Sequence, residues 1–277
     1  MNLDHYLTDL ITRALAEDRG PGDVTSEATI PADSVSTAVM LAKQGLVLAG
    51  LDVARAVFHV LDPAIQFTAL AKDGDRIESG TEIAKLSGKT RVLLAGERVA
   101  LNLIQHISGI ATLTAKYVQR VKGLKAQVLD TRKTTPGLRQ LEKYAVRVGG
   151  GKNHRFGLFD GVLIKDNHIK AAGSIAKAVA GARQKAHHLL KIEVETKTLD
   201  EVREALDAKA DIIMLDNMPC DKMREAVTLI DCAALVEASG NVTLETIRAI
   251  AETGVDYISS GSLTHSAPAA DISMKIK

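Results

Sequence analysis

The sequence predicts an α/β protein in two parts, a shorter α+β part followed by a longer part in which strands and helices alternate. The first observation is a change of rhythm near residue 97: short alternating runs precede it, and apolar runs separated by helical patterns follow it. The second is composition, because 46% hydrophobic and 25% charged residues in a chain of 277 are typical of an ordinary globular protein. Such a chain can bury a core without metal or disulfide support.

The first part begins with apolar residues at helical spacing from Leu3 to Leu15. Short runs that alternate between apolar and polar residues follow, bounded by the turn-forming Asp73-Gly74-Asp75 and Glu78-Ser79-Gly80. The alternation returns at 271–276, which is predicted to join the first part as an edge strand. The other predicted elements are a helix over 3–17, strands over 35–41, 65–70 and 83–86, and a helix over 52–61.

The second part is predicted to open with a long helix over 97–122 and to continue as parallel strands with crossover helices. Six strand–helix units are fewer than the eight of a complete barrel, which takes roughly 250 residues. A reduced barrel and an open sheet therefore both remain possible. The predicted strands are 127–129, 161–164, 190–194, 211–215, 233–236 and 255–258, and the predicted helices lie near 138–148, 171–188, 198–208, 219–230 and 243–253.

Charge and residue usage exclude several classes of function. The net charge is +1, so no global field attracts nucleic acid or an anionic membrane, and any anion site must come from local clustering. No apolar run reaches 18 residues, and the acidic N-terminal segment lacks the apolar core of a signal peptide. Cys220 and Cys232 lack metal-ligand spacing, which favours free thiols in the cytoplasm.

Polar or charged residues follow each of the six predicted strands in the second part. The carboxyl ends of parallel strands face one crevice, so six polar ends together favour a functional site over solvated loops. These segments are Asp130–Gly137, Lys165–His168, Glu195, Asp216–Asn217, Ser239–Asn241 and Ser259–Ser262.

The two final segments favour a phosphate site. Ser239-Gly240-Asn241 precedes a predicted helix and offers backbone N–H groups and a hydroxyl, although the same residues also serve as ordinary caps and turns. Cations beside glycine turns indicate an anionic substrate, the alternative being a solvated basic face. They are Arg132, Lys133, Arg139, Arg147, Lys152, His154, Arg155, Lys165 and Lys170.

Glu195 and Asp216 end two neighbouring predicted strands. Isolated carboxylates there could merely cap helices. Facing a cationic, phosphate-binding mouth, they are better placed to hold Mg²⁺ or ribose hydroxyls and to stabilise a positively charged sugar transition state. The pattern therefore indicates a ligand with carboxylates, phosphates and a sugar.

Several motifs together resemble the quinolinate phosphoribosyltransferases, also called carboxylating nicotinate-nucleotide pyrophosphorylases. The most specific is Gly149-Gly-Gly-Lys-Asn-His-Arg-Phe-Gly-Leu-Phe-Asp-Gly-Val-Leu-Ile-Lys-Asp-Asn-His168. The resemblance spans nearly the whole chain. The other matching segments are 17–26, 96–103, 130–139, 192–195, 213–217 and 237–240.

This resemblance implies an N-terminal α/β sandwich over residues 1–103, completed by 266–277, and an open, reduced α/β barrel of six to seven parallel strands over 104–265. It also implies a homodimer, or a multiple of dimers, with active sites shared between subunits. The implied reaction transfers the phosphoribosyl group of phosphoribosyl pyrophosphate to quinolinate with loss of CO2 and pyrophosphate. The product is nicotinate mononucleotide, in de novo NAD biosynthesis, and neither nucleic acid nor membrane is an expected partner.

The resemblance also implies a role for each matching residue. The quinolinate-binding set is Arg98, Arg132, His154, Arg155 and Lys165. The phosphoribosyl and phosphate set is Lys133, Glu195, Asp216, Ser239, Gly240 and Gly261. Lys133, Lys165, Glu195 and Asp216 are expected to be catalytic, and Glu195 and Asp216 to bind Mg²⁺, either directly or indirectly.

Three alternative functions remain open. Lys165 at a strand end could be the nucleophile of a Schiff-base aldolase. The segment Asp73–Gly80 resembles the turn of a biotinyl-type carrier domain, although no Met-Lys-Met acceptor is present. A relative within the same family could act on nicotinate or in another pathway.

Overall fold

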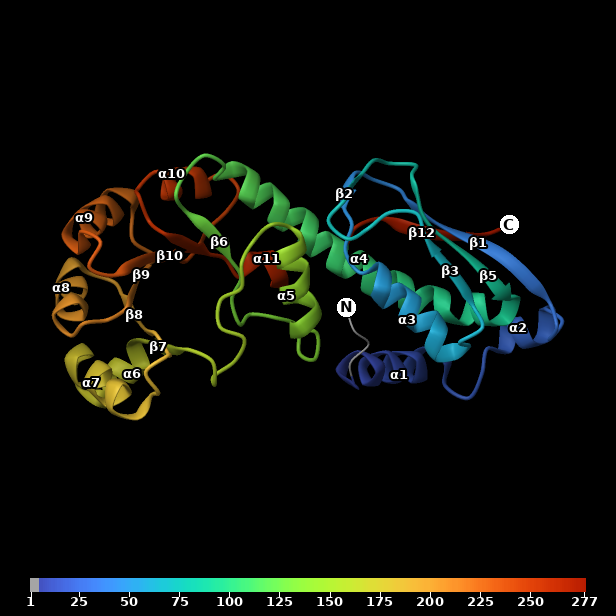
Figure 1. The fold of residues 1–277 in the computed structure, drawn as a ribbon, viewed down its shortest axis with the longest axis horizontal. Helices are drawn as coiled ribbons and strands as arrows, with labels where there is room; N and C mark the ends of the chain where they lie inside the picture. The colour runs from blue at the N-terminus through green and yellow to red at the C-terminus, as the bar shows by residue number, and fades with distance from the viewer. Residues whose placement is uncertain (1–4) are drawn as a thin grey trace. The chain divides into compact units, whose positions relative to one another are not determined.

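The computed structural model describes residues 5–277, which form two compact units (Figure 1). One unit comprises residues 5–113, Gln140–Gly149 and Ala267–Lys277, and the other comprises Thr114–Arg139 and Gly150–Ser266. The family resemblance implies domain boundaries at 103/104 and 265/266, whereas these units divide at 113/114, 139/140, 149/150 and 266/267. The pattern did not indicate that residues 140–149 belong with the first unit.

The first unit is built on an antiparallel sheet in the order β12-β1-β5-β3. The C-terminal strand β12 pairs with β1 at the edge, with Met40 opposite Met274, which confirms the predicted return of the chain. The alternating runs place one face of β1 and β5 in the core, where Met40 and Ile83 are fully buried. The strands are β1 (Val35–Ala42), β3 (Gln66–Ala69), β5 (Glu82–Lys89) and β12 (Ile272–Ile276).

Helices α1 (His5–Arg19), α3 (Leu51–Leu61) and the first part of α4 (Thr90–Arg120) complete this core. The described part of the predicted N-terminal helix buries Leu7, Ile11 and Leu15, whereas Leu3 lies outside the described residues. Gly50, with φ +100°, begins α3 against α4, and a Cβ at Gly50 would overlap the side chain of Ile107. Close packing of α3 on α4 therefore depends on that glycine.

Asp73 connects three parts of the first unit. Its carboxylate accepts hydrogen bonds from the backbone N–H groups of Gly50 and Leu51 at the start of α3 and from the hydroxyl of Tyr144 on α5 (Arg139–Val148). On the same helix, the buried carboxylate of Glu142 lies 2.9 Å from His106 Nε2 on α4. These contacts explain why α5 belongs with the first unit.

The second unit contains a parallel sheet of six strands in the order β6-β11-β10-β9-β8-β7. The first and second strands in sequence, β6 and β7, are the two edges, so the sheet is open. Figure 1 shows helices α7, α8, α9 and α10 on its outer side. The strands are β6 (Gln127–Leu129), β7 (Val162–Ile164), β8 (Ile192–Thr196), β9 (Ile212–Asp216), β10 (Leu235–Ser239) and β11 (Tyr257–Ser259).

The helices of the second unit are α6 (Asp166–Ala172), α7 (Ile175–Lys185), α8 (Leu199–Asp207), α9 (Cys220–Ile230), α10 (Ile247–Ala251) and α11 (Ser262–His265). The single helix predicted over 171–188 is wrong, because Gly173 with φ +94° ends α6 and Ser174 caps α7. The long helix α4 begins at Thr90, seven residues before the predicted start at Glu97. Within residues 5–277, no helix combines the length and apolarity that crossing a membrane requires.

Three short elements of the first unit were not predicted: α2 (Val24–Thr29) and the two-residue strands β2 (Leu46–Val47) and β4 (Arg76–Ile77), which pair with each other. Two residues cannot show a period. The pairing of β2 with β4 is instead supported by Thr112 Oγ1, which accepts a hydrogen bond from the Val47 N–H.

Candidate active site

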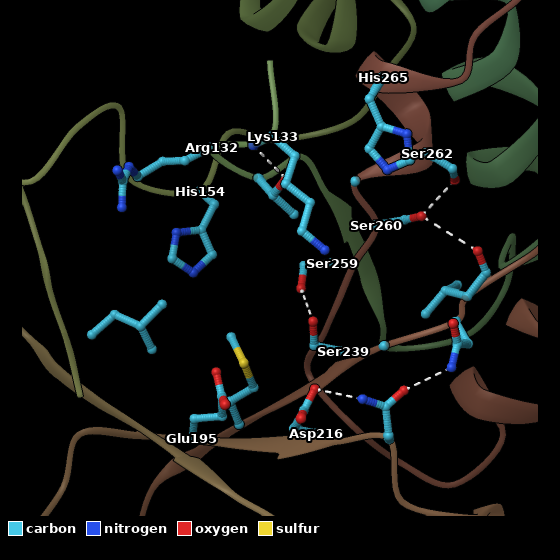
Figure 2. Close-up of a pocket in the computed structure, with 18 of the residues that line it drawn as sticks. Arg132, Lys133, His154, Glu195, Asp216, Ser239, Ser259, Ser260, Ser262 and His265 are labelled. Carbon is cyan, nitrogen blue, oxygen red and sulfur yellow. Dashed lines mark hydrogen bonds between the residues drawn. The ribbon is translucent and has the colours of Figure 1, made fainter. Parts of the chain in front are cut away.

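A pocket of about 680 Å³ lies at the carboxyl ends of the strands in the second unit. Residues at or beyond the end of every strand from β6 to β11 line it. Figure 2 shows Arg132 and His154 on one side of the pocket, Ser260 and Ser262 on the other, and Glu195 and Asp216 below both. The expectation that polar strand ends converge is therefore confirmed.

Of the cations that the sequence places beside glycine turns, Arg139, Arg147, Lys152 and Lys170 do not line this pocket. All the residues to which the family resemblance gives a role line it, except one. Arg98 does not, because it lies exposed on α4 within the first unit. The residues that the structure brings together are Arg132, Lys133, His154, Arg155, Lys165, Glu195, Asp216, Ser239, Gly240 and Gly261.

Arg132 and Arg155 give the pocket a positively charged wall. Burial and the neighbouring charge of Arg132 lower the pKa of Arg155. The Nε–H groups of both side chains are buried and find no acceptor among the described residues, while Arg155 Nη1 donates to the Gly161 carbonyl at 2.9 Å. Two like charges held together with unused donors are suited to a ligand with more than one anionic group.

Beneath this wall, His154 lies against two buried glutamates. His154 Nε2 is 3.0 Å from Glu193 Oε2 and 3.8 Å from Glu237 Oε1. Its Nδ1 accepts a hydrogen bond from the Arg155 backbone N–H, so Nε2 carries the proton that is donated to Glu193. The backbone of His154 is fixed in turn by Asp130, whose Oδ1 accepts its N–H at 2.8 Å.

Glu237 is only 2% exposed, and burial together with the charge of Glu193 raises its pKa to about 8. Glu237 is therefore mostly protonated at neutral pH. His154, Glu193 and Glu237 also form a group that could hold a metal ion, with their ligand atoms within 4.8 Å of one another. The 3.0 Å contact between His154 and Glu193 is a direct hydrogen bond, so a proton is sufficient to hold these side chains together without a metal ion.

Glu193 and Glu237 were not predicted as site residues, although the sequence contained a signal. Side chains two residues apart point to the same face of a strand, so Glu193 lies below Glu195 and Glu237 below Ser239. An acidic residue inside an otherwise apolar parallel strand therefore indicates a polar layer under the pocket.

The two predicted acidic ligands lie on adjacent strands. Glu195 is nearly buried, with 10% of its side chain exposed, and accepts a hydrogen bond from Lys165 Nζ at 3.1 Å. Asp216 ends β9, next to Ser239 at the end of β10. These carboxylates offer the hard oxygen ligands that Mg²⁺ prefers, and two of them suit an ion whose remaining ligands are substrate oxygens and water.

Opposite the acids, the loops after β10 and β11 present hydroxyls and backbone. Ser260 and Ser262 hydroxyls are 2.7 Å apart, and the Ser259 hydroxyl donates to Ser239 at 3.1 Å. A Cβ at Gly261 would press on Lys133 and His265, so the glycine allows the lysine stem to cross this loop. The ammonium of Lys133 is therefore associated with the hydroxyl-rich side of the pocket.

One detail of the expected phosphate site is wrong. The helix predicted directly after Ser239-Gly240-Asn241 begins only at Ile247, because Thr243 and Thr246 form a turn through their hydroxyls. Loop N–H groups and serine hydroxyls are consequently the available anion donors there.

An open parallel α/β barrel with cationic, acidic and hydroxyl-rich walls at one mouth defines an enzyme for a phosphorylated, carboxylated ligand. Residues 23–108 match the family described as "Quinolinate phosphoribosyl transferase, N-terminal domain", and residues 110–275 match its C-terminal domain. The chain belongs to the quinolinate phosphoribosyltransferase family.

Relatives match over nearly the full length. A "Probable nicotinate-nucleotide pyrophosphorylase [carboxylating]" of Bacillus subtilis is 48% identical over 98% of this chain and 93% of its own. A mitochondrial "Quinolinate phosphoribosyltransferase [decarboxylating] 2b" of Nicotiana tabacum is 46% identical over 98% of this chain and 82% of its own. The crystal structure of NadC from Streptococcus pyogenes, 45% identical, superimposes with a TM-score of 0.96 and covers 100% of this chain and 99% of that one.

Proposed function

We propose that the protein transfers the phosphoribosyl group of phosphoribosyl pyrophosphate to quinolinate and releases CO2 and pyrophosphate, giving nicotinate mononucleotide. The observation that carries this proposal is the division of one pocket into a paired-guanidinium wall and a wall of carboxylates and hydroxyls. The first suits a planar dicarboxylate, and the second suits a phosphorylated sugar.

Quinolinate binds at the wall that contains Arg132, Arg155 and Lys165. Guanidinium groups bind carboxylates with two parallel hydrogen bonds, and two adjacent guanidiniums match two adjacent carboxylates. Both ring nitrogens of His154 already contact protein groups, so His154 contributes its ring to the shape of this subsite and fixes the backbone that leads to Arg155.

The phosphoribosyl group lies across the opposite half of the pocket. Glu195 and Asp216 contact the ribose and Mg²⁺, while Lys133, Ser239, Gly240 and Gly261 surround phosphate oxygens. When bound, Mg²⁺ neutralises the charge of the departing pyrophosphate.

The protein's own charges account for both chemical steps. The quinolinate nitrogen has a lone pair, so no general base is needed, and the carboxylates of Glu195 and Asp216 stabilise the positive charge that develops at ribose C1. Ribosylation makes the ring a pyridinium. The bond from ring C2 to its carboxylate then breaks, CO2 leaves, and the electron pair stays at C2 beside Lys133 or Lys165 until C2 takes a proton.

We further propose a cytoplasmic homodimer, or a multiple of dimers, in which Arg98 reaches the site of the neighbouring subunit. The turn at residues 156–160, which follows Arg155 of the pocket, supports this proposal. Its apolar side chains Leu158 and Phe159 are 73% and 76% exposed, and a neighbouring subunit would cover them. Asp160 accepts the N–H groups of Phe156 and Gly157 and so holds this apolar turn in place.

The test is turnover of quinolinate beside nicotinate as a competing substrate, with phosphoribosyl pyrophosphate and Mg²⁺. A strong preference for quinolinate is expected, because nicotinate has a single carboxylate and would leave one of the two guanidinium groups without an anionic partner. Equal use of nicotinate, without CO2 release, would contradict the proposed role of Arg132 and Arg155. Borohydride trapping of a carbonyl substrate on Lys165 would instead support an aldolase.

A further inference from the structure

We propose that Asn217 and Asn241 are positioning residues that fix the orientation of the Asp216 carboxylate through two amide hydrogen bonds in series. The inference rests on the proposed function, in which Asp216 contacts the phosphoribosyl group. Neither asparagine has a role in the chemistry described above, although both line the pocket.

The two hydrogen bonds form a chain along the carboxyl ends of β9 and β10. Asn217 Nδ2 donates to Asp216 Oδ1 at 3.0 Å, and Asn241 Nδ2 donates to Asn217 Oδ1 at 3.0 Å; Figure 2 shows both as dashed lines leading away from Asp216. A carboxylate only accepts hydrogen bonds, so Asn217 must turn its NH2 group toward Asp216. Its amide oxygen is then directed to Asn241, which must donate.

Both asparagines have a backbone conformation that would suit glycine better. Asn217 has φ +55° and Asn241 has φ +48°, in the left-handed region that side chains other than Gly rarely adopt. Each residue directly follows, or nearly follows, a strand that ends in the pocket. Asparagine tolerates this region, but glycine would adopt it with less strain, so replacement by glycine removes the amide and relaxes the backbone at the same time.

Gly240 leaves the space that the Asn217 side chain occupies. Gly240 has φ +98°, and a Cβ there would overlap the Oδ1, Cγ and Nδ2 atoms of Asn217. The Asn217 backbone N–H donates to the Ser239 carbonyl at 2.9 Å, which fixes this residue to the end of β10. Asn217 is therefore held by hydrogen bonds of both its backbone and its side chain.

Rotation of the Asp216 carboxyl group is restricted as a result. Its Oδ1 accepts the Asn217 amide, so Oδ2 would be the oxygen left to contact the ribose and Mg²⁺. Both amide hydrogen bonds are exposed to solvent, and exposed hydrogen bonds contribute little to folding. Loss of the amides should therefore affect ligand binding and turnover without reducing stability.

The central variant is Asn217→Gly, which relieves the backbone strain and removes the hydrogen bond to Asp216. Its unfolding temperature should equal or exceed that of the wild type. Its kcat/KM for phosphoribosyl pyrophosphate should fall by about tenfold, because a misoriented group weakens transition-state contacts. KM for quinolinate should stay within about twofold, because Arg132 and Arg155 are untouched.

A matched control is Asp231→Gly. Asp231 also has a left-handed backbone, with φ +41°, but it is exposed at the end of α9 and does not line the pocket. It should gain the same backbone relief and keep wild-type kinetics. Asn241→Gly should cause a smaller loss than Asn217→Gly, because it removes only the second hydrogen bond.

A double-mutant cycle separates positioning from a direct contact with substrate. If Asn217 acts through Asp216, Asn217→Gly should cause no further loss once Asp216→Asn is present. Fully additive losses, or wild-type kinetics in Asn217→Gly, would overturn the proposal. A wild type that forms no nicotinate mononucleotide would refute the proposed function instead. In that case, calorimetric titration with phosphoribosyl pyrophosphate in EDTA would still compare its affinity for the wild type and for Asn217→Gly. Equal affinities would overturn the proposed positioning of Asp216.

Discussion

Glu195 and Asp216 place negative charge in a pocket whose other charged residues are mainly cations. An anionic ligand alone would be bound better without them, so their presence indicates a positive charge that develops during the reaction or arrives with the ligand. The Lys165–Glu195 ion pair also keeps the lysine beside the proposed position of the quinolinate carboxylates.

The first prediction concerns these two carboxylates. Glu195→Gln and Asp216→Asn should each lower kcat by about tenfold to a thousandfold, the scale of lost electrostatic stabilisation of a transition state. Folding should change little, because both substitutions keep the volume and polarity of the side chain. Steady-state kinetics and thermal unfolding of each variant provide the measurement, and near-normal turnover would remove that carboxylate from the mechanism.

The second prediction concerns the proton on Glu237. Its pKa is about 8 in the folded protein against an ordinary value of 4.5, so the folded state binds more protons between these values. The unfolding free energy should therefore fall as pH rises from about 4.5 to 8. Above that range, Glu237 should cause no further change with pH.

Glu237→Gln, which resembles the protonated acid, should remove this part of the pH dependence. Its stability relative to the wild type should rise by a few kcal/mol between pH 5 and pH 8, measured by urea unfolding across the series. Parallel pH profiles for the two proteins would show that Glu237 is ionised in the fold at neutral pH.

Among single residues, the sequence could predict those that directly follow a recognisable strand. Glu195 and Asp216 are examples. Glu193 was missed because its role depends on a neighbour from another strand, Glu237, and on His154 from the segment before β7. Hydrogen bonds such as that from Asn241 to Asn217 depend on backbone angles that no residue pattern reveals.

Among the elements, α5 shows how tertiary contacts decide where a helix belongs. It follows β6 in the chain, as a crossover helix should, yet it packs in the first unit through Tyr144 and Glu142. Burial and the hydrogen bond to Asp73 raise the pKa of Tyr144, so the phenol stays a donor at any physiological pH.

The third prediction tests this connection. Asp73→Ala removes the acceptor for two N–H groups of α3 and for Tyr144, and it should lower the unfolding free energy by about 1 to 3 kcal/mol. Asp73→Asn keeps one acceptor oxygen and should lose less. Tyr144→Phe serves as the comparison that removes only the phenol contact. Chemical denaturation of the three variants gives the order, and an unchanged Asp73→Ala would contradict the capping role.

Long periodic elements such as α3 and the strands of the parallel sheet could be predicted because each shows its own spacing. The break at Gly173 and the late start of α10 could not, since each depends on a local cap or hydroxyl turn that competes with the helical pattern. The pairing of β2 with β4 is set by partners distant in the chain.

For the whole molecule, the sequence pattern left open whether the second part forms a barrel or a sheet. The strand order shows an open barrel. The first strand, β6, pairs with the last, β11, as in a barrel, but β6 and β7 do not pair with each other and so leave the barrel open. Arg98 is the sequence-predicted ligand that this pocket does not contain, and it lies in the other unit.

The fourth prediction concerns the proposed sharing of sites between subunits. Arg98→Ala and Lys165→Ala should each be inactive alone. After joint unfolding and reassembly, half of the dimers should be mixed, and each mixed dimer should contain one intact site, so about a quarter of wild-type activity should return. A mixture that stays inactive despite verified heterodimers would place Arg98 in the site of its own chain.

The most direct test of the central claim is the stoichiometry of a single reaction with quinolinate labelled in its C2 carboxylate. Nicotinate mononucleotide, pyrophosphate and labelled CO2 should appear in equal amounts, and each should require both phosphoribosyl pyrophosphate and Mg²⁺. The release of labelled CO2 without pyrophosphate, or of pyrophosphate with a nucleotide that retains both carboxylates, would contradict decarboxylation that follows phosphoribosyl transfer in this pocket.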